Sequence, residues 1–357
     1  MTDRARPGPG RPFLQPAAWT AATLTLIHVF LAALPDPGAG AGTPPAKPGA
    51  QAEAAPQSRQ APPARGEERL APDLARRFRQ EPVITVFDHS AVAVRSMPLE
   101  EYVAHVVAGE VVPTWSPDAL RAQAVAARTY TIRLLLAGED ATPRRLYGTD
   151  TSTNPAEAQA FSERVPRSVR EAVAATRGEI LVYRGKPVVA LFSACAAART
   201  ADLEESFPGD PRAAEAPYLR PVSSRCEEVA PADIRRWRAA LTTAELAAIA
   251  GLEPGAVDRV RIARRGPSGR AVFIQIGPRR IYAAALRLRA GANRLKSTWI
   301  TEIERGEGDV WIFHGRGWGH GVGLDQWGAE AMARDGRGYR EILRHYYPGT
   351  GLVRLYR

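Results

Sequence analysis

Apolar residues recur with helical spacing in two consecutive segments between residues 96 and 138. In the first segment they lie three or four residues apart, as in a helix that packs one face into a core: Leu99, Tyr102, Val103, Val106 and Val107. Ser96 is suited to cap this helix, and Pro113 ends it. The second segment begins at Pro117 and ends before Gly138, and its many alanines predict that a neighbouring element packs very close.

A carboxylate interrupts the apolar stripe of the first helix. Glu110 lies four residues after Val106 and three after Val107, so it occupies the next position of the same stripe. Partial desolvation there would raise its pKa toward neutrality, as a general acid requires, and Gly109 would let a ligand or another backbone approach. Alternatively, Glu110 turns outward to solvent or pairs with Arg128 on the next helix. The pattern alone leaves both interpretations open.

The rest of the chain mixes strand and helix patterns without regular alternation. Runs of apolar and β-branched residues predict strands within residues 82–94, 178–195 and 264–276. Helical patterns occupy residues 166–176 and 242–251 and begin again near Asp325 and Gly338. This order predicts an α+β fold rather than an α/β fold. We expect one domain over residues 78–357, with a small α/β insert at about residues 231–300.

The first 77 residues have a different character. Basic residues precede an uncharged apolar run at residues 17–34, which is typical of a signal peptide or signal anchor. A buried helix of a soluble domain is the alternative, but the tract that follows offers it little to pack against. Residues 35–77 are rich in proline, alanine and glycine and predict a disordered linker. Residues 1–34 are therefore predicted to export the domain to the periplasm or cell envelope, either secreted or anchored in the membrane.

The charge balance suggests an anionic partner. The 357 residues include 48 lysines and arginines against 38 aspartates and glutamates, a formal net charge of +10. Nucleic acid, an acidic lipid surface and an acidic polysaccharide all fit this balance. An extracytoplasmic location disfavours nucleic acid. Two cysteines are too few for a disulfide-rich scaffold or a four-cysteine zinc site.

A glycine-rich segment, "HGRGWGHGVG" at residues 314–323, is the second candidate site. It lacks the lysine and the Ser/Thr of a phosphate-binding loop. His314 and His320 are possible metal ligands, but no third well-placed ligand is apparent. The glycines either bring the backbone close to a substrate lined by His320, Gln326 and Trp327, or they form a tightly packed turn. Both interpretations stay open.

Cys195 also has two interpretations. It is a candidate nucleophile with His320 as its base, but its surroundings match neither a cysteine protease nor a nucleophile elbow. The alternative is a buried strand residue, or a disulfide with Cys226 in an oxidising compartment.

Two long blocks carry a resemblance to a known family. The segment "MPLEEYVAHVVAGEVVPTWSPDALRAQAVAARTYTI" at residues 97–132 resembles the opening block of the SpoIID/LytB family, the stage II sporulation protein D type. The segment "GRGWGHGVGLDQWGAEAMARDGRGYREILRHYYPGT" at residues 315–350 resembles its closing block. The resemblance covers roughly residues 80–357 and implies action on peptidoglycan. Some members are lytic transglycosylases that cleave glycan strands stripped of stem peptides, and others are described as amidase enhancers.

The resemblance implies a role for Glu110, which matches the family's catalytic glutamate in "GEVVPTW". An ordinary glycosidase uses two carboxylates. A lytic transglycosylase needs one, because the muramic acid 6-hydroxyl of the substrate itself attacks and leaves a 1,6-anhydromuramic end. The expected substrate-positioning residues are Gln123, Arg128, His320, Gln326 and Trp327. No cofactor is expected.

The chain departs from the family pattern in two places. Ala197 and Ala198 in "CAAART" stand where members commonly carry two glycines. The Cys/His cluster with which some members bind zinc is absent from residues 149–159, so no metal is predicted. The first departure keeps a rival function open, a non-catalytic module that binds peptidoglycan and activates a partner amidase. A third possibility is an acidic-polymer binder without wall chemistry.

Overall fold

A computed structural model describes residues 68–357. The predicted signal segment 1–34 and most of the predicted linker therefore lie outside the described residues. The linker prediction was wrong at its end, because Pro72–Arg77 form a short helix, α2, with proline in its first turn and arginines in its last. Just before it, the Ala71 amide donates to the Gly185 carbonyl at 2.9 Å. No helix within residues 68–357 has the length and hydropathy to cross a membrane.

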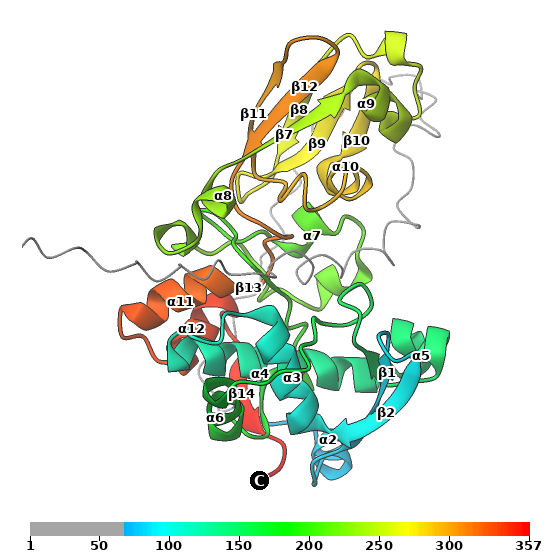
Figure 1. The fold of residues 1–357 in the computed structure, drawn as a ribbon. Helices are drawn as coiled ribbons and strands as arrows, with labels where there is room; N and C mark the ends of the chain where they lie inside the picture. Colours follow the sequence, from blue (N-terminus) through cyan, green and yellow to red (C-terminus); the bar gives the residue numbers. More distant parts are fainter. Residues whose placement is uncertain (1–67) are drawn as a thin grey trace, which may run out of the picture.

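The described residues form a lower and an upper lobe in the view of Figure 1. The helices of the lower lobe are α3 (Leu99–Glu110), α4 (Pro117–Ala137), α5 (Thr142–Tyr147), α6 (Arg167–Ala175), α11 (Gln326–Arg334) and α12 (Tyr339–Tyr346). Its strands are β1 (Val83–Asp88), β2 (Ala93–Pro98), β3 (Thr151–Ser152), β4 (Glu179–Tyr183), β5 (Lys186–Pro187), β6 (Phe192–Ser193), β13 (Leu324–Asp325) and β14 (Gly351–Arg354). This mixture of helices and small sheets confirms the predicted α+β class.

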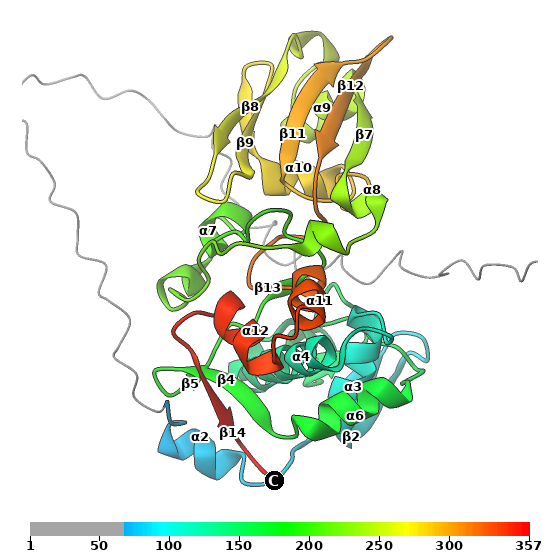
Figure 2. The ribbon, with the colours of Figure 1, turned by 90° about the vertical axis from the view of Figure 1, so that its left-hand side faces the viewer.

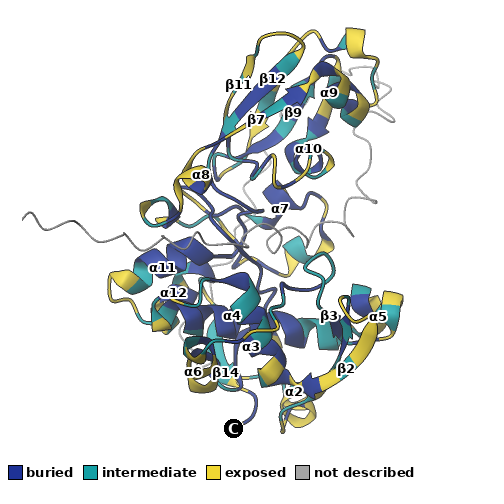
Figure 3. Ribbon diagram, viewed as in Figure 1, coloured by how far each residue is buried: buried dark blue, intermediate teal, exposed yellow. Residues whose placement is uncertain are grey.

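The alanine-rich helix α4 runs through the middle of the lower lobe (Figure 2). It is buried without a break from Ala122 to Ile132, and α3, α6, α11 and α12 all contact it. Its small side chains allow this close approach. Figure 3 shows the contrast with the peripheral strand β2, which is largely exposed. The close packing predicted for the second helix is therefore confirmed.

Distant parts of the chain meet in the small sheets of the lower lobe. Strand β1 pairs with β2 in antiparallel and with β3 in parallel orientation. Strand β4 pairs with β5 across a turn at Arg184-Gly185 and with the late strand β14. Strand β13 lies parallel to β6, which brings the end of the glycine-rich segment against residues 192–193.

The upper lobe contains two three-stranded sheets. Its elements are α8 (Ala232–Arg235), β7 (Trp237–Thr242), α9 (Thr243–Ala250), β8 (Val260–Arg265), β9 (Ala271–Ile276), β10 (Arg279–Tyr282), α10 (Ala283–Arg289), β11 (Ile300–Arg305) and β12 (Val310–Gly315). The sheet orders are β11-β12-β7 and β10-β9-β8. Because β12 pairs with β7, the lobe continues past the predicted insert boundary at residue 300 to residue 315. A short helix, α7 (Leu203–Ser206), lies between the lobes (Figure 1).

The glycine-rich segment is a tightly packed turn. Gly317, Gly319, Gly321 and Gly323 all have positive φ, and a Cβ on any of them would collide with the protein. For three of them the obstacle lies in residues 191–195, which run alongside. These glycines therefore serve contact between two protein segments rather than approach to a substrate.

We predict that Gly323→Ala destabilises the protein more than Gly336→Ala. Both glycines have positive φ, +75° and +81°, so alanine at either position costs roughly 1 kcal/mol of backbone strain. At Gly323 the new Cβ would also collide with the Leu191 carbonyl, whereas nothing lies within 4 Å at Gly336. Thermal unfolding of the two variants should show the larger loss of Tm for Gly323→Ala. Equal losses would contradict the packing role.

Candidate active site

Glu110 is the last residue of α3 and lies inside the lower lobe. Its exposed fraction is 8%. One carboxyl oxygen, Oε1, accepts a hydrogen bond from the Ala160 amide at 2.7 Å. The other, Oε2, accepts one from Gln326 Nε2 at 3.3 Å. Glu110 therefore neither turns out to solvent nor pairs with Arg128, and the first interpretation of the sequence pattern holds.

Burial controls the ionisation of this group. It raises the pKa of Glu110 to about 7, while the hydrogen bonds from Ala160 and Gln326 lower the pKa by less. No cation contributes to the shift. The carboxyl group therefore exchanges its proton near neutral pH, as a group that both donates and accepts a proton must.

The backbone of residues 160–161 closes over the end of α3. A Cβ on Gly109 would meet the backbone of Ala160 and Phe161 at 2.8–3.0 Å. The absence of a side chain at Gly109 therefore lets the Ala160 amide reach Glu110. The sequence analysis left open whether Gly109 admits a ligand or a backbone, and the structure shows a backbone.

Two tyrosines lie within electrostatic range of Glu110. The negative charge of Glu110 and, more strongly, burial raise the pKa of Tyr102 and of Tyr130, so both stay neutral. The Tyr102 hydroxyl shares a hydrogen bond with Thr151 Oγ1 at 2.7 Å. The sequence analysis counted Tyr102 only as an apolar position and missed Tyr130. Its spacing was the available signal, because Tyr130 lies seven residues after Gln123, on the same face of α4.

Gln123 is buried with an unused amide. Its exposed fraction is 1%, and within residues 68–357 neither its oxygen nor its nitrogen has a hydrogen-bond partner. An unpaired buried polar group costs roughly 1–3 kcal/mol. A bound ligand that hydrogen-bonds to the Gln123 amide would remove this cost.

Helix α11 brings Gln326 to Glu110 through its N-terminal cap. The side chain of Asp325 accepts hydrogen bonds from the Gly328 amide at 2.9 Å, the Ala196 amide at 2.7 Å and Ser224 Oγ at 2.5 Å. Burial raises the pKa of Asp325 to about 6, against the effect of these bonds. Trp327, two residues after Asp325, is buried and packs its ring on Trp115 with centroids 4.6 Å apart.

The upper lobe contributes one buried arginine to this framework. Arg270 has no exposed surface, and its Nη2 donates to the Ala196 carbonyl at 2.8 Å. Asp325 accepts from the amide of the same residue, so the two side chains hold Ala196 from both sides. Ala197, which follows, has φ +60°, in the left-handed region that favours glycine. Glycine adopts this conformation without strain, which suits the glycine pair expected there from the family resemblance. The sequence analysis missed both Arg270 and Asp325.

Two residues expected to bind substrate have structural partners instead. Arg128 is fully buried and pairs with Glu100 at 2.6 Å, ten residues before Glu110 and about 15 Å away along α3. His320 is buried, with Nδ1 accepting from the Val322 amide at 3.1 Å and Nε2 bonded to the Phe192 carbonyl at 2.9 Å. Burial, more than the nearby arginines, lowers the pKa of His320 to about 3. Neither side chain offers a free polar atom to a sugar in this structure, so its contacts give no support to a substrate-positioning role for either residue.

The structure also resolves the cysteine and metal alternatives. Cys195 and Cys226 form a disulfide, which leaves no thiol for a nucleophile. Their sulfurs and an Asp325 oxygen lie within 4.8 Å of one another, the only group of potential metal ligands at that spacing in residues 68–357. With the sulfurs bonded to each other and the carboxylate hydrogen-bonded, this set does not suit a metal. His314 pairs with Glu304 at 2.8 Å.

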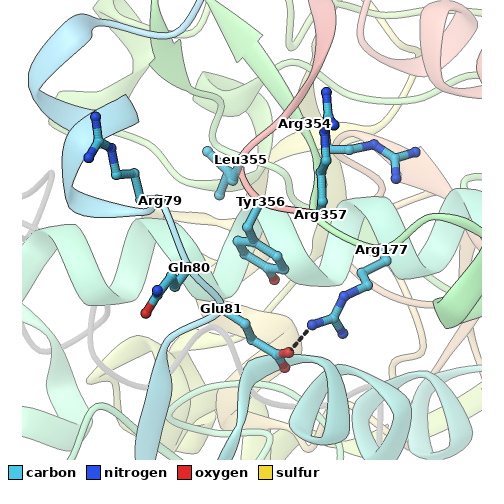
Figure 4. A pocket seen from close by; sticks show the side chains of 8 residues that line it. All are labelled: Arg79, Gln80, Glu81, Arg177, Arg354, Leu355, Tyr356 and Arg357. Atoms are coloured by element: carbon cyan, nitrogen blue, oxygen red, sulfur yellow. Dashed lines mark hydrogen bonds and ion pairs between the residues drawn. The ribbon is translucent and has the colours of Figure 1, made fainter.

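A cavity of about 840 Å³ lies elsewhere, at the base of the lower lobe (Figure 4). Arginines line it, and two of them are paired, Arg177 with Glu81 and Arg354 with Glu179. The Tyr356 hydroxyl beside it donates to Glu100, which places the cavity at the opposite end of α3 from Glu110. We assign it no part in the chemistry.

Comparison with known proteins agrees with this geometry. The profile of the stage II sporulation protein family, SpoIID, matches residues 88–183, which include Glu110. An uncharacterised protein of Brachyspira hyodysenteriae is 33% identical over 75% of this chain and 70% of its own length. The chain belongs to the SpoIID/LytB family. A domain of unknown function, DUF8618, matches residues 226–323, which contain the upper lobe.

Named relatives in the family carry two descriptions. Stage II sporulation protein D of Bacillus amyloliquefaciens is 29% identical over 77% of this chain and 80% of its own length. The amidase enhancer of Bacillus subtilis is 25% identical over 70% of this chain and 40% of its own length. The second name corresponds to the rival function of the sequence analysis, whereas the first states no activity.

We predict that Gln326→Leu raises the pKa of Glu110 above 7. The Gln326 hydrogen bond stabilises the carboxylate, and leucine removes it while filling a similar volume. Carbon-13 NMR titration of the glutamate carboxyl groups, with Glu110→Gln used for assignment, measures this directly. Gln80→Leu, an exposed substitution in the same lobe, should leave the titration unchanged. A lower or identical pKa in Gln326→Leu would contradict the proposed electrostatics.

Proposed function

We propose that this protein is a lytic transglycosylase that cleaves peptidoglycan glycan strands, with Glu110 as the only general acid and base. The observation that carries the proposal is a buried carboxyl group, Glu110, whose pKa burial raises to about 7 and which lies within the segment matched by the SpoIID family model. The resemblance gives this position to the family's catalytic glutamate. Strands already stripped of stem peptides are the expected substrate.

The reaction needs one proton donor that later becomes the acceptor. Protonated Glu110 gives its proton to the glycosidic oxygen as the bond from that oxygen to the muramic acid C1 breaks. The resulting carboxylate removes the proton of the muramic acid 6-hydroxyl as that oxygen bonds to C1. Glu110 is protonated again at the end, and no water is consumed. The Ala160 amide and Gln326 stabilise the carboxylate between the two steps.

A second carboxylate is not required by this scheme. Ordinary glycosidases place two carboxyl groups roughly 5–9.5 Å apart, one on each side of the bond. Asp325 is a buried acid that directly precedes Gln326 in the sequence. Its oxygens already accept three hydrogen bonds. This arrangement favours attack by a group of the substrate.

Neutral polar side chains on α4 suit the hydroxyl and amide groups of a sugar. The Gln123 amide offers a donor and an acceptor without partners in the described part of the chain, and Tyr130 lies on the same face of α4. We propose that a bound sugar supplies the missing partners of Gln123. Gln326 positions Glu110, and Trp327 fixes the start of α11 by packing on Trp115.

We propose that the protein works outside the cytoplasmic membrane, with residues 17–34 as its signal peptide or anchor. The Cys195–Cys226 disulfide supports an oxidising compartment. An amidase that removes stem peptides is the expected partner. The rival function, a non-catalytic activator of such an amidase, is favoured by the similarity to the amidase enhancer. The two functions differ in whether new glycan ends form.

We predict that Glu110→Gln abolishes cleavage, because the amide can neither donate nor accept the proton in both steps. The full chain would be incubated with peptide-free glycan strands and intact sacculi, and mass spectrometry would detect 1,6-anhydromuramic ends. Glu171→Gln, which changes an exposed glutamate of α6, is the matched control and should cleave like wild type. New ends from Glu110→Gln at the wild-type rate would refute the assignment. Binding without new ends from the wild type would favour the amidase activator.

We also predict that cleavage falls as pH rises through about 7. The first step requires protonated Glu110, which is the dominant form below its raised pKa and is lost above it. A kcat/KM profile on peptide-free strands from pH 5 to 9 tests this expectation. A rate that stayed level or rose between pH 7 and 9 would contradict Glu110 as the acid.

A further inference from the structure

An exposed sheet face on the upper lobe carries arginines and aromatic rings. The sheet β10-β9-β8 buries one face, with Ile274 and Ile276, in the core of this lobe. Strand residues alternate between faces, so the register defines the opposite face. Its members are Arg261, Arg264, Phe273, Gln275, Arg280 and Tyr282.

The aromatic rings hold two of these arginines. Phe273 and Tyr282 stack with centroids 4.6 Å apart. The guanidinium groups of Arg264 and Arg280 both lie 5.0 Å from the centre of the Phe273 ring. Such cation–π contacts restrain long side chains without neutralising their charge. The guanidiniums are thus held at the surface with their hydrogen-bond donors available.

The arginines of this face share two features. Arg261, Arg264 and Arg280 are exposed, and none of them forms an ion pair with a carboxylate within residues 68–357. Elsewhere on the surface, arginines such as Arg294 and Arg305 pair with Glu245 and Asp309. Three unpaired charges of one sign on a flat face create a positive potential that attracts an anion.

We propose that this face binds a carboxylate-bearing glycan strand, as a second contact apart from Glu110. Arg264 and Arg280 lie two strands apart, about 10 Å, so an extended polymer with repeated carboxylates can engage more than one arginine. A guanidinium binds a carboxylate through two parallel hydrogen bonds. The choice of a glycan, rather than another polyanion, as the ligand rests on the proposed function. The presence of the charged face does not depend on that function.

The test compares two triple substitutions in the full chain carrying Glu110→Gln, so that binding is measured without cleavage. The first replaces Arg261, Arg264 and Arg280 with Gln, and the control replaces Arg76, Arg145 and Arg164 of the lower lobe, which are also exposed and form no ion pair within residues 68–357. Both lower the net charge by three. Sedimentation with peptide-free glycan strands at low salt should show at least tenfold weaker binding for the first and a change below twofold for the control.

Further measurements separate the alternatives. Glycan whose carboxyl groups are converted to amides should bind the parent and the first triple equally. The double substitution Arg264→Lys with Arg280→Lys keeps the charge but loses the paired hydrogen bonds. Its affinity for glycan should lie between those of the parent and the first triple. The double substitution also serves as the test if the Gln triple does not fold. Equal losses in both triples, or none in the first, would overturn the proposal. So would tighter binding of single-stranded DNA than of glycan at this face.

The binding test of the arginine face and the cleavage test of Glu110 can fail separately. If Glu110→Gln still cleaves but the Arg triple loses binding, the proposed function fails and the glycan face stands. If anhydro ends depend on Glu110 but both triples bind alike, the reverse holds.

Discussion

Burial of the Glu110 carboxyl group is the constraint on which the site depends. Ionising a carboxyl group away from water is unfavourable unless hydrogen bonds or a cation compensate. Here one backbone amide and one side-chain amide compensate in part, and no cation shifts the pKa. A nearby arginine would keep Glu110 ionised and unable to donate a proton. The partial compensation leaves both protonation states accessible near neutral pH.

Maintaining that compensation requires segments far apart in the sequence. Gln326 lies 216 residues after Glu110, at the start of α11. The same helix reaches the turn between α3 and α4, where Glu330 Oε2 accepts from the Ser116 amide at 2.9 Å. Its own start is fixed by Asp325, which bonds Ala196 next to the disulfide. The packed glycine turn and Arg270 of the upper lobe hold the other side of that junction. Ala196 is therefore one point at which the upper lobe is tied to the site.

The sequence predicted the parts of this arrangement that depend on local periodicity. The alanines of α4 predicted its close packing, and the apolar stripe made the core side of α3 one of two open positions for Glu110. Periodicity carries no information on which distant segment covers a face, so the contacts of Asp325 and Arg270 were missed. For the same reason Arg128 and His320 were assigned to the substrate. Both are polar residues in motif blocks, but their partners, Glu100 and the Phe192 carbonyl, are structural.

The arginine content shows why net charge locates no site by itself. A formal charge of +10 suggests an anionic partner. Many arginines, however, are buried or form ion pairs with carboxylates of the protein itself. Arg128 and Arg270 are buried among carbonyl groups, and Arg177 and Arg354 pair with glutamates around the cavity of Figure 4. A charge that is already paired adds little to the attraction of a ligand. Unpaired arginines on a regular face, held by aromatic rings rather than by acids, are the ones whose charge remains available. On this reasoning we propose that the upper lobe binds the anionic partner, while the bond that Glu110 is proposed to cleave enters a buried environment in which no cation shifts the pKa of Glu110.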